Sequence, residues 1–147
     1  MKDNIVADQI RLLETKSQNR FLAFDAKLEG GDFRFGDGKT DRYYLYDWNK
    51  LIQTVSWPFR LNHSMKAEIS MRYLVNNTSG GKVNLTVGEE RFQIEIEPAK
   101  EKSEIRTVVI GRCKIHAGIG EIKITPEIIS GKDIMQLFEI NVSPVKL

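Results

Sequence analysis

The stretch "KAEISMRYLVNNTSGGKVNLTVGEERFQIEI", residues 66–96, decides the fold class. In its first ten residues every second side chain is apolar: Ala67, Ile69, Met71, Tyr73 and Val75. A period of two places such side chains on one face of a β-strand and leaves the other face to solvent. Turn-forming residues follow at 76–82, and "GEE" at 88–90 separates two further alternating runs. This stretch therefore predicts three strands joined by short turns.

The same alternation extends to both sides of this stretch. Further strands are expected within 21–30, 54–59, 105–115, 121–129 and 134–144. A short strand or helix is expected within 5–14, with strand preferred. Because no long segment with a helical period interrupts these runs, the chain is predicted to be all-β, a sandwich or a barrel. We assign residues 1–20 to an N-terminal extension or linker and residues 21–147 to the β-domain.

Length and composition restrict the class of protein. The chain has 147 residues, which suits one domain, with 41% hydrophobic and 29% charged residues. Its 22 basic and 20 acidic residues are interspersed, so no basic patch predicts nucleic-acid binding. No apolar run approaches the roughly 20 residues of a membrane span. Cys113, the only cysteine, excludes an internal disulfide and a cysteine-based zinc cluster, and we expect it to be packed inside a strand.

No arrangement of residues in the sequence predicts catalysis. The carboxylates lie mostly at outward strand positions: Glu68, Glu95, Glu97, Glu121 and Glu127. A glycosidase needs two carboxylates facing one cleft, and nothing marks such a pair. The two histidines lack metal-ligand spacing, and no phosphate-binding glycine loop precedes a helix. We therefore expect that the chain is not an enzyme by itself.

The aromatic stretch "YYLYDWNKLIQTVSWPF", residues 43–59, contains both tryptophans. After Lys50 the apolar residues share one parity, so Trp57 is expected in the core. Trp48 lies among polar neighbours ahead of that strand, and two readings stay open for it: a rim residue that covers the core, or a platform for a ligand. The expected core is Trp57, Phe59, Ile69, Met71, Tyr73, Val83, Leu85, Val87, Phe92, Ile94, Ile96, Leu137 and Ile140.

The order of several motifs resembles a known family over residues 21–145. These motifs are "AFDAKLEG", a Trp ahead of "VSWPF", "EISMRYLV", "GGKVNLTVG" and "IKITPEIISGKDIMQLFEINVSP". Together they resemble a galactose-binding-like jelly roll, a two-sheet antiparallel β-sandwich. More narrowly, they are similar to carbohydrate-binding-type domains that follow the catalytic barrel in bacterial glycoside hydrolases, α-L-fucosidases in particular. The chain departs from that pattern at "NHSMKAE", where family members usually carry an "AG-T-Y" motif.

The resemblance implies a non-catalytic carbohydrate-binding module, accessory to a glycoside hydrolase and located outside the cell or in the periplasm. Its expected partners are carbohydrate and a catalytic hydrolase domain, with neither nucleic acid nor membrane. The alternative is a structural domain that packs on a catalytic domain, or a protein-interaction module, without sugar binding. Rings that stack on sugar and polar groups that bind hydroxyls are expected in the loops at one edge: Trp48, Tyr46 and Tyr43, with Asp47, Asn49, Arg42, Asn76 and Asn77.

Related modules often bind a structural calcium ion through an acidic residue near the first strand and an Asp in the last strand. Asp25 or Glu29 matches the first position in this chain. The last strand instead offers Gln136, Glu139 and Asn141. A Ca²⁺ ion takes six or more oxygen ligands. We therefore expect no cofactor and no metal among the site residues, with a structural calcium ion as the less favoured alternative.

Overall fold

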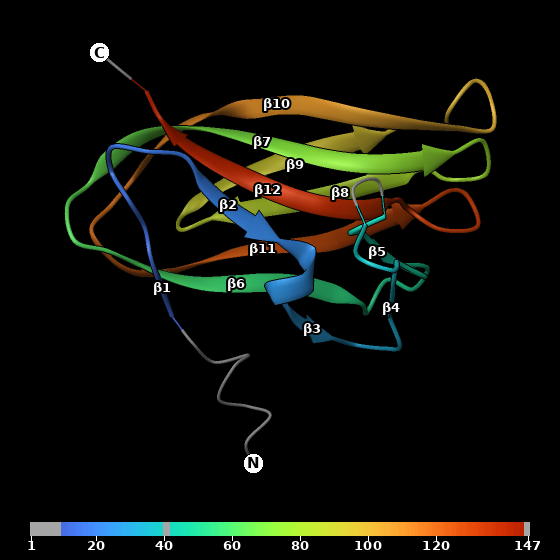
Figure 1. The fold of residues 1–147 in the computed structure, drawn as a ribbon, viewed down its shortest axis with the longest axis horizontal. Coiled ribbons are helices and arrows are strands. Elements are labelled where there is room, and N and C mark those ends of the chain that lie inside the picture. The colour runs from blue at the N-terminus through green and yellow to red at the C-terminus, as the bar shows by residue number, and fades with distance from the viewer. Residues whose placement is uncertain (1–9, 40–41, 146–147) are drawn as a thin grey trace.

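The computed structural model describes residues 10–39 and 42–145, which form two facing β-sheets (Figure 1). Sheet A has the order β1-β6-β11-β8-β9, with β3 also paired to β6, and sheet B has the order β10-β7-β12-β5-β4, with β2 also paired to β12. The strands are β1 (Arg11–Leu12), β2 (Asn19–Leu22), β3 (Lys27–Glu29), β4 (Arg34–Phe35), β5 (Leu45–Tyr46), β6 (Thr54–Leu61), β7 (Met65–Asn76), β8 (Gly81–Val87), β9 (Glu90–Ile96), β10 (Ser103–Ile115), β11 (Gly118–Ile129) and β12 (Gln136–Pro144). The predicted antiparallel sandwich is thus confirmed.

The stretch that decided the fold class divides between the two sheets. β7 lies in sheet B between β10 and β12, whereas β8 and β9 form an antiparallel hairpin at the edge of sheet A. The turn between β7 and β8 needs backbone freedom, since Gly80 and Gly81 have φ angles of 150° and 147°. A Cβ atom on Gly81 would lie 2.0 Å from the carbonyl oxygen of Ile128. Glycine is therefore required where the chain leaves one sheet for the other.

The core fills the space between the sheets and contains nearly all of the side chains expected there. The exception is Phe92, which is only partly buried because β9 is an edge strand with no neighbour on its outer side. Cys113 is buried in β10, as predicted. Burial raises the pKa of its thiol to about 11, and Glu90 adds to this shift. The thiol is therefore protonated and inert at neutral pH.

The segment 21–30, expected as one strand, forms two strands in different sheets. β2 pairs with β12 in sheet B, a 3₁₀ turn at Ala23–Asp25 follows, and β3 pairs with β6 in sheet A. The crossing places Ala23 in the core, with no exposed surface. The alternating pattern in the sequence does not reveal this crossing, because β2 and β3 bury side chains in the same core.

Residues 10–20 contact the sandwich at several points. β1 pairs in parallel with β6, and Leu13 is buried. The buried side chain of Asn19 bonds both the nitrogen and the oxygen of Glu14 and donates to the carbonyl of Val142 in β12. The domain boundary at residue 21 stays a prediction. Residues 1–9, which hold the first half of the element expected within 5–14, lie outside the described residues.

Candidate functional site: an aromatic strip beside a buried carboxylate

Four aromatic rings lie edge to face along one side of the sandwich, and we call them the aromatic strip: Tyr43, Phe138, Tyr44 and Tyr46. The ring centroids are 4.7 Å apart for Tyr43 and Phe138, 5.5 Å for Tyr44 and Phe138, and 6.0 Å for Tyr44 and Tyr46. Such T-shaped pairs add about 0.5–1.5 kcal/mol each beyond area burial. Phe138 is fully buried, whereas the three tyrosines are half-buried and keep part of their surface open to solvent.

An irregularity in β12 allows Phe138 to reach the strip. The pairing of β12 with β7 shifts register between Leu137 and Glu139, so one extra residue is inserted there. Such a bulge lets two neighbouring residues depart from strict alternation. Leu137 lies in the core cluster while Phe138 packs against the tyrosines. The sequence "QLFEI" already showed apolar residues on both faces, which is the signal of this bulge.

Two arginines lie over rings of the strip. The guanidinium carbon of Arg72 is 5.1 Å from the centroid of Phe138, and that of Arg34 is 5.1 Å from the centroid of Tyr46. Both distances suit a cation–π contact. Arg34 also forms an ion pair with Asp47, with Nε 2.5 Å from Oδ2. Positive charge thus lies over Phe138, between Tyr43 and Tyr44, and over Tyr46 at one end of the strip.

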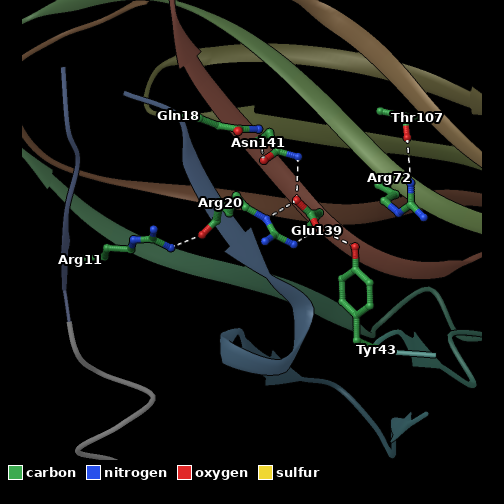
Figure 2. A network of polar contacts seen from close by, with 8 residues as sticks. All are labelled: Arg11, Gln18, Arg20, Tyr43, Arg72, Thr107, Glu139 and Asn141. Carbon is green, nitrogen blue, oxygen red and sulfur yellow. Dashed lines mark hydrogen bonds and ion pairs between the residues drawn. The ribbon is translucent and has the colours of Figure 1, made fainter. Parts of the chain in front are cut away.

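A buried carboxylate, Glu139, adjoins the strip and gathers four donors. Arg20 donates from Nε at 2.9 Å and from Nη2 at 2.6 Å, the Tyr43 hydroxyl donates at 2.8 Å, and the Asn141 amide donates at 2.9 Å. Figure 2 shows these side chains converging on Glu139 from neighbouring elements. Glu139 is only 4% exposed. The bidentate Arg20 pair is the arrangement that a buried carboxylate requires.

The electrostatics of Glu139 indicate a structural role for its charge. Burial by itself would raise the pKa of Glu139, but the hydrogen bonds from Arg20, Tyr43 and Asn141 outweigh burial and lower it. Burial and the bond to Glu139 raise the pKa of Tyr43. Glu139 is therefore ionised and Tyr43 protonated at neutral pH. Because the carboxylate oxygens are already occupied, Glu139 fixes the position of Tyr43 and lacks the free oxygen of a general base.

Trp48 lies in the core, so the reading of this ring as an exposed ligand platform is wrong. It has no exposed surface, its Nε1 donates to the carbonyl of Gln53 at 3.0 Å, and its ring packs edge to face with Phe33 at 5.8 Å. The polar neighbours that suggested a loop ring instead build the turn around it. The side-chain oxygen of Gln53 accepts from the backbone nitrogens of Asn49 and Lys50. The alternative reading, a residue that covers the core, describes its position.

The other predicted site residues do not form one site and lie at several places on the sandwich. Tyr43 belongs to the Glu139 group, and Tyr46 with Asp47 lies at the far end of the strip. Arg42 is exposed and paired with Asp37 at 2.9 Å. Asn49, also exposed, is bonded through its backbone to Gln53. The remaining predicted residues are Asn76, which ends β7, and Asn77, which begins the loop between β7 and β8.

That loop and the loop between β11 and β12 form a shallow pocket of about 340 Å³. The residues that line it are Asn77, Thr78, Ser79, Pro98, Ser130, Gly131 and Lys132. Beside it, the Ser79 hydroxyl donates to Oδ1 of Asp133 at 2.7 Å. Burial raises the pKa of Asp133, and the charge of Asp47 adds to this effect. The carbonyl of Trp48 accepts from the nitrogen of Ile134, so this end of the sandwich joins the pocket loops to the stretch that contains Tyr46.

Tyr44, Phe138 and Arg72 were not predicted as site residues, and Glu139 was named only as a last-strand position for calcium. Phe138, Arg72 and Glu139 lie on strands, whereas the sequence predicted sugar contacts in loops. The residues suggested for calcium also do not fit a metal site, because Asp25 is exposed and Glu139 is bonded to Arg20. Within the described ranges no three acidic, histidine or cysteine side chains gather, and no helix is long and apolar enough to span a membrane.

Comparisons with family models and with curated proteins find no match. Among solved structures, a family 35 carbohydrate-binding module from Clostridium thermocellum is 16% identical with a TM-score of 0.65, over 88% of this chain and 99% of that one. The Podospora anserina GH26-CBM35 β-(1,4)-mannanase is 15% identical with a TM-score of 0.67, over 90% of this chain and 28% of that one. The Cry4Aa toxin from Bacillus thuringiensis is 12% identical with a TM-score of 0.71, over 94% of this chain and 25% of that one.

This chain thus spans about a quarter of the mannanase and of the toxin, and nearly the whole of the isolated module. Identities this low establish the fold alone. The narrower resemblance to α-L-fucosidases stays a prediction. The chain therefore has the jelly-roll β-sandwich fold found in family 35 carbohydrate-binding modules.

Proposed function

We propose that this chain is a non-catalytic carbohydrate-binding module that binds glycan weakly through the tyrosines of the aromatic strip. The observation that carries the proposal is the strip itself, in which Tyr44 packs on Tyr46 and buried Phe138 connects Tyr44 to Tyr43, so that three half-buried tyrosines lie near guanidinium and carboxylate groups. A sugar ring has an apolar C–H face that stacks on an aromatic ring, while its hydroxyls need polar partners. The strip supplies both kinds of contact within one surface.

Of the residues predicted from the sequence, Tyr43, Tyr46 and Asp47 keep a place in this proposal. Asn77 joins them from the end pocket, together with Thr78 and Lys132. A single aromatic contact contributes about 0.5–1.5 kcal/mol beyond area burial. Binding of one sugar unit is therefore expected near 1 mM, which corresponds to about −4 kcal/mol. The chain has no catalytic role in this proposal, since Glu139 is fully occupied by donors.

The proposal places the chain outside the cell or in the periplasm, beside a catalytic glycoside hydrolase domain. Its support is the mannanase, where a fold of this type occupies 28% of a larger hydrolase chain. The proposed role is to hold the polymer near a catalytic centre that another domain supplies. The proposal names neither nucleic acid nor membrane as a partner, because charges of both signs are interspersed in the sequence and no apolar run has the length of a membrane span.

A glycan array followed by titration calorimetry tests the proposal. Tyr44→Ala and Tyr46→Ala should each weaken binding of the best glycan about tenfold, the effect of losing roughly 1.4 kcal/mol. Ile119→Ala provides the control, because Ile119 is 71% exposed and is the second residue of β11. The start of β11 lies at the opposite end of the sandwich from β4 and β5 (Figure 1). Thermal melting checks that each variant folds. Unchanged binding in both tyrosine variants would refute a role for the strip.

A second candidate function is docking on a catalytic domain without sugar binding. Leu51 and Ile52 favour it, because these adjacent apolar side chains are 57% and 69% exposed on a turn held by Gln53. An exposed apolar pair on a rigid turn is typical of an interface. In that case the array gives no signal. Leu51→Ser with Ile52→Ser would then weaken co-purification with a hydrolase domain encoded beside this chain.

A further inference from the structure

The outer face of sheet B carries an excess of positive charge. On this face lie alternate side chains of β7, β10 and β12, together with Arg20 of β2. Its charged members among the described residues are Arg20, Lys66, Glu68, Arg72, Arg112, Lys114 and Glu139. Arg20 pairs with Glu139, and Arg112 pairs with Glu68 at 3.2 Å. Three cations are left without a carboxylate partner among the described residues: Lys66, Arg72 and Lys114.

Two of these cations face each other. Lys66 and Lys114 are directly opposite in the antiparallel pairing of β7 and β10, and both are exposed. Like charges at opposite positions destabilise a sheet. The fold gains nothing from this juxtaposition, which instead presents two ammonium groups at one point on the surface.

The third cation, Arg72, lies over the ring of Phe138 but has no carboxylate partner among the described residues. Its cross-strand neighbour is Glu139, but the oxygens of that carboxylate are occupied by Arg20, Tyr43 and Asn141. Its Nε is buried without a hydrogen-bond partner, and its one bond is a 3.5 Å contact from Nη1 to the Thr107 hydroxyl. Figure 2 shows the guanidinium turned toward Thr107, beside the Glu139 group. A buried unpaired donor costs stability, so a hydrophobic residue would suit the fold better.

The spacing of these cations suits an extended ligand. Lys66 and Arg72 are six residues apart on one strand, which is roughly 20 Å along the sheet. Between them the same face offers polar groups that suit hydroxyls: Ser70 of β7, Thr107 of β10 and Ser143 of β12. A single small anion reaches one end only, whereas a linear polymer with repeated negative groups reaches both.

We propose that the outer face of sheet B binds an acidic polysaccharide, with Arg72 at one end and the Lys66–Lys114 pair at the other contacting its carboxylate or sulfate groups. This inference rests on the proposed function for its ligand class and adds the charge of the glycan and a second binding surface. The planar fork of Arg72 suits a bidentate contact with carboxylate or sulfate oxygens. Because Arg72 also lies over Phe138, the polymer continues from this face onto the aromatic strip.

Two matched pairs of polymers test the inference by affinity electrophoresis: polygalacturonate with its methyl ester, and dextran sulfate with dextran. Each pair differs in charge but not in backbone, and comparison of the two pairs distinguishes carboxylate from sulfate. The acidic member of at least one pair should retard the chain, and the neutral member should retard it much less. Arg72→Gln should weaken retardation about tenfold, the effect of losing a charge-assisted hydrogen bond. Arg91→Gln removes the same charge from exposed β9 in sheet A and should have less than about a twofold effect.

A second variant, Lys66→Gln with Lys114→Gln, changes only exposed side chains and should also weaken retardation. Equal retardation of the chain by the acidic and the neutral polymer of each pair would overturn this inference. If Tyr44→Ala then abolished retardation by both polymers, the proposed function would still be supported. If Arg72→Gln and Arg91→Gln weakened retardation equally, the effect would come from net charge alone and the inference would be overturned. Retardation by duplex DNA or polyphosphate equal to that by the acidic glycans would overturn it as non-specific attraction.

Discussion

Trp48→Ala should destabilise the fold strongly, although sequence neighbours alone give this ring a loop-like setting. Trp48 is fully buried, packs against Phe33 and donates its indole N–H to the carbonyl of Gln53. Truncation of a buried aromatic to alanine costs about 3–5 kcal/mol. An unpaired buried acceptor on Gln53 costs about 1–3 kcal/mol if water does not replace the donor. These losses are a large share of the free energy of unfolding of a typical protein, which is about 5–15 kcal/mol.

Urea unfolding followed by far-UV circular dichroism measures the effect at equilibrium. Trp57→Ala should give a loss of similar size, since Trp57 is also buried and donates to the carbonyl of Leu22 at 2.8 Å. Trp48→Phe keeps most of the apolar volume and should lose about 1–3 kcal/mol, mainly through the unpaired carbonyl. Leu51→Ala, three residues away and exposed, should stay within about 0.5 kcal/mol of the wild type. A loss below about 1 kcal/mol in Trp48→Ala would refute its place in the core.

Three further predictions concern titratable groups. Glu139→Gln should lower the free energy of unfolding by about 1–3 kcal/mol at pH 7, as measured by urea unfolding. Because the folded-state pKa of Glu139 is lowered, the stability that its charge contributes is present above pH 4.5 and disappears as the pH falls below that value. A difference in stability between variant and wild type that stayed constant at all pH values would contradict this reasoning. Asp133→Asn should be at least as stable as the wild type at pH 7. Because the folded-state pKa of Asp133 is raised, its carboxyl group stabilises the fold fully below pH 3.8 and loses this effect as the pH rises. A variant that was less stable than the wild type at pH 7 would argue against this prediction. The Cys113 thiol should resist alkylation at pH 8 until urea unfolds the chain, because its pKa is about 11; fast labelling of the folded protein would show that β10 opens.

The sandwich was predictable because period-two alternation depends on burial, which the sequence displays directly. Ile69 and Met71 in β7, and Val83 and Leu85 in β8, are all buried as their parity requires. Strand pairing was less accessible, since the same alternation serves either sheet. The crossing at Ala23 illustrates this, because the residues before and after it bury side chains in one shared interior.

The candidate site was harder to predict, because its members are assembled by register and not by local chemistry. Tyr43 was selected as a loop residue, yet its hydroxyl partner Glu139 is 96 residues away. Trp48 was misleading because the polar groups near it are backbone-directed, as in the bonds that Gln53 makes to the nitrogens of Asn49 and Lys50. Polar neighbours in sequence indicate an exposed ring only when their own side chains face solvent.

The bulge in β12 connects the fold with both proposed surfaces. In a regular strand Phe138 and Glu139 would point to opposite faces, and one of them would enter the core. The inserted residue lets Phe138 pack against Tyr43 and Tyr44 while Glu139 stands beside Arg72 and binds Arg20. Bulges that redirect side chains in this way are common next to functional sites. The aromatic strip and the cationic face of sheet B therefore depend on one backbone irregularity, so a deletion that restored regular pairing there would disturb both surfaces together.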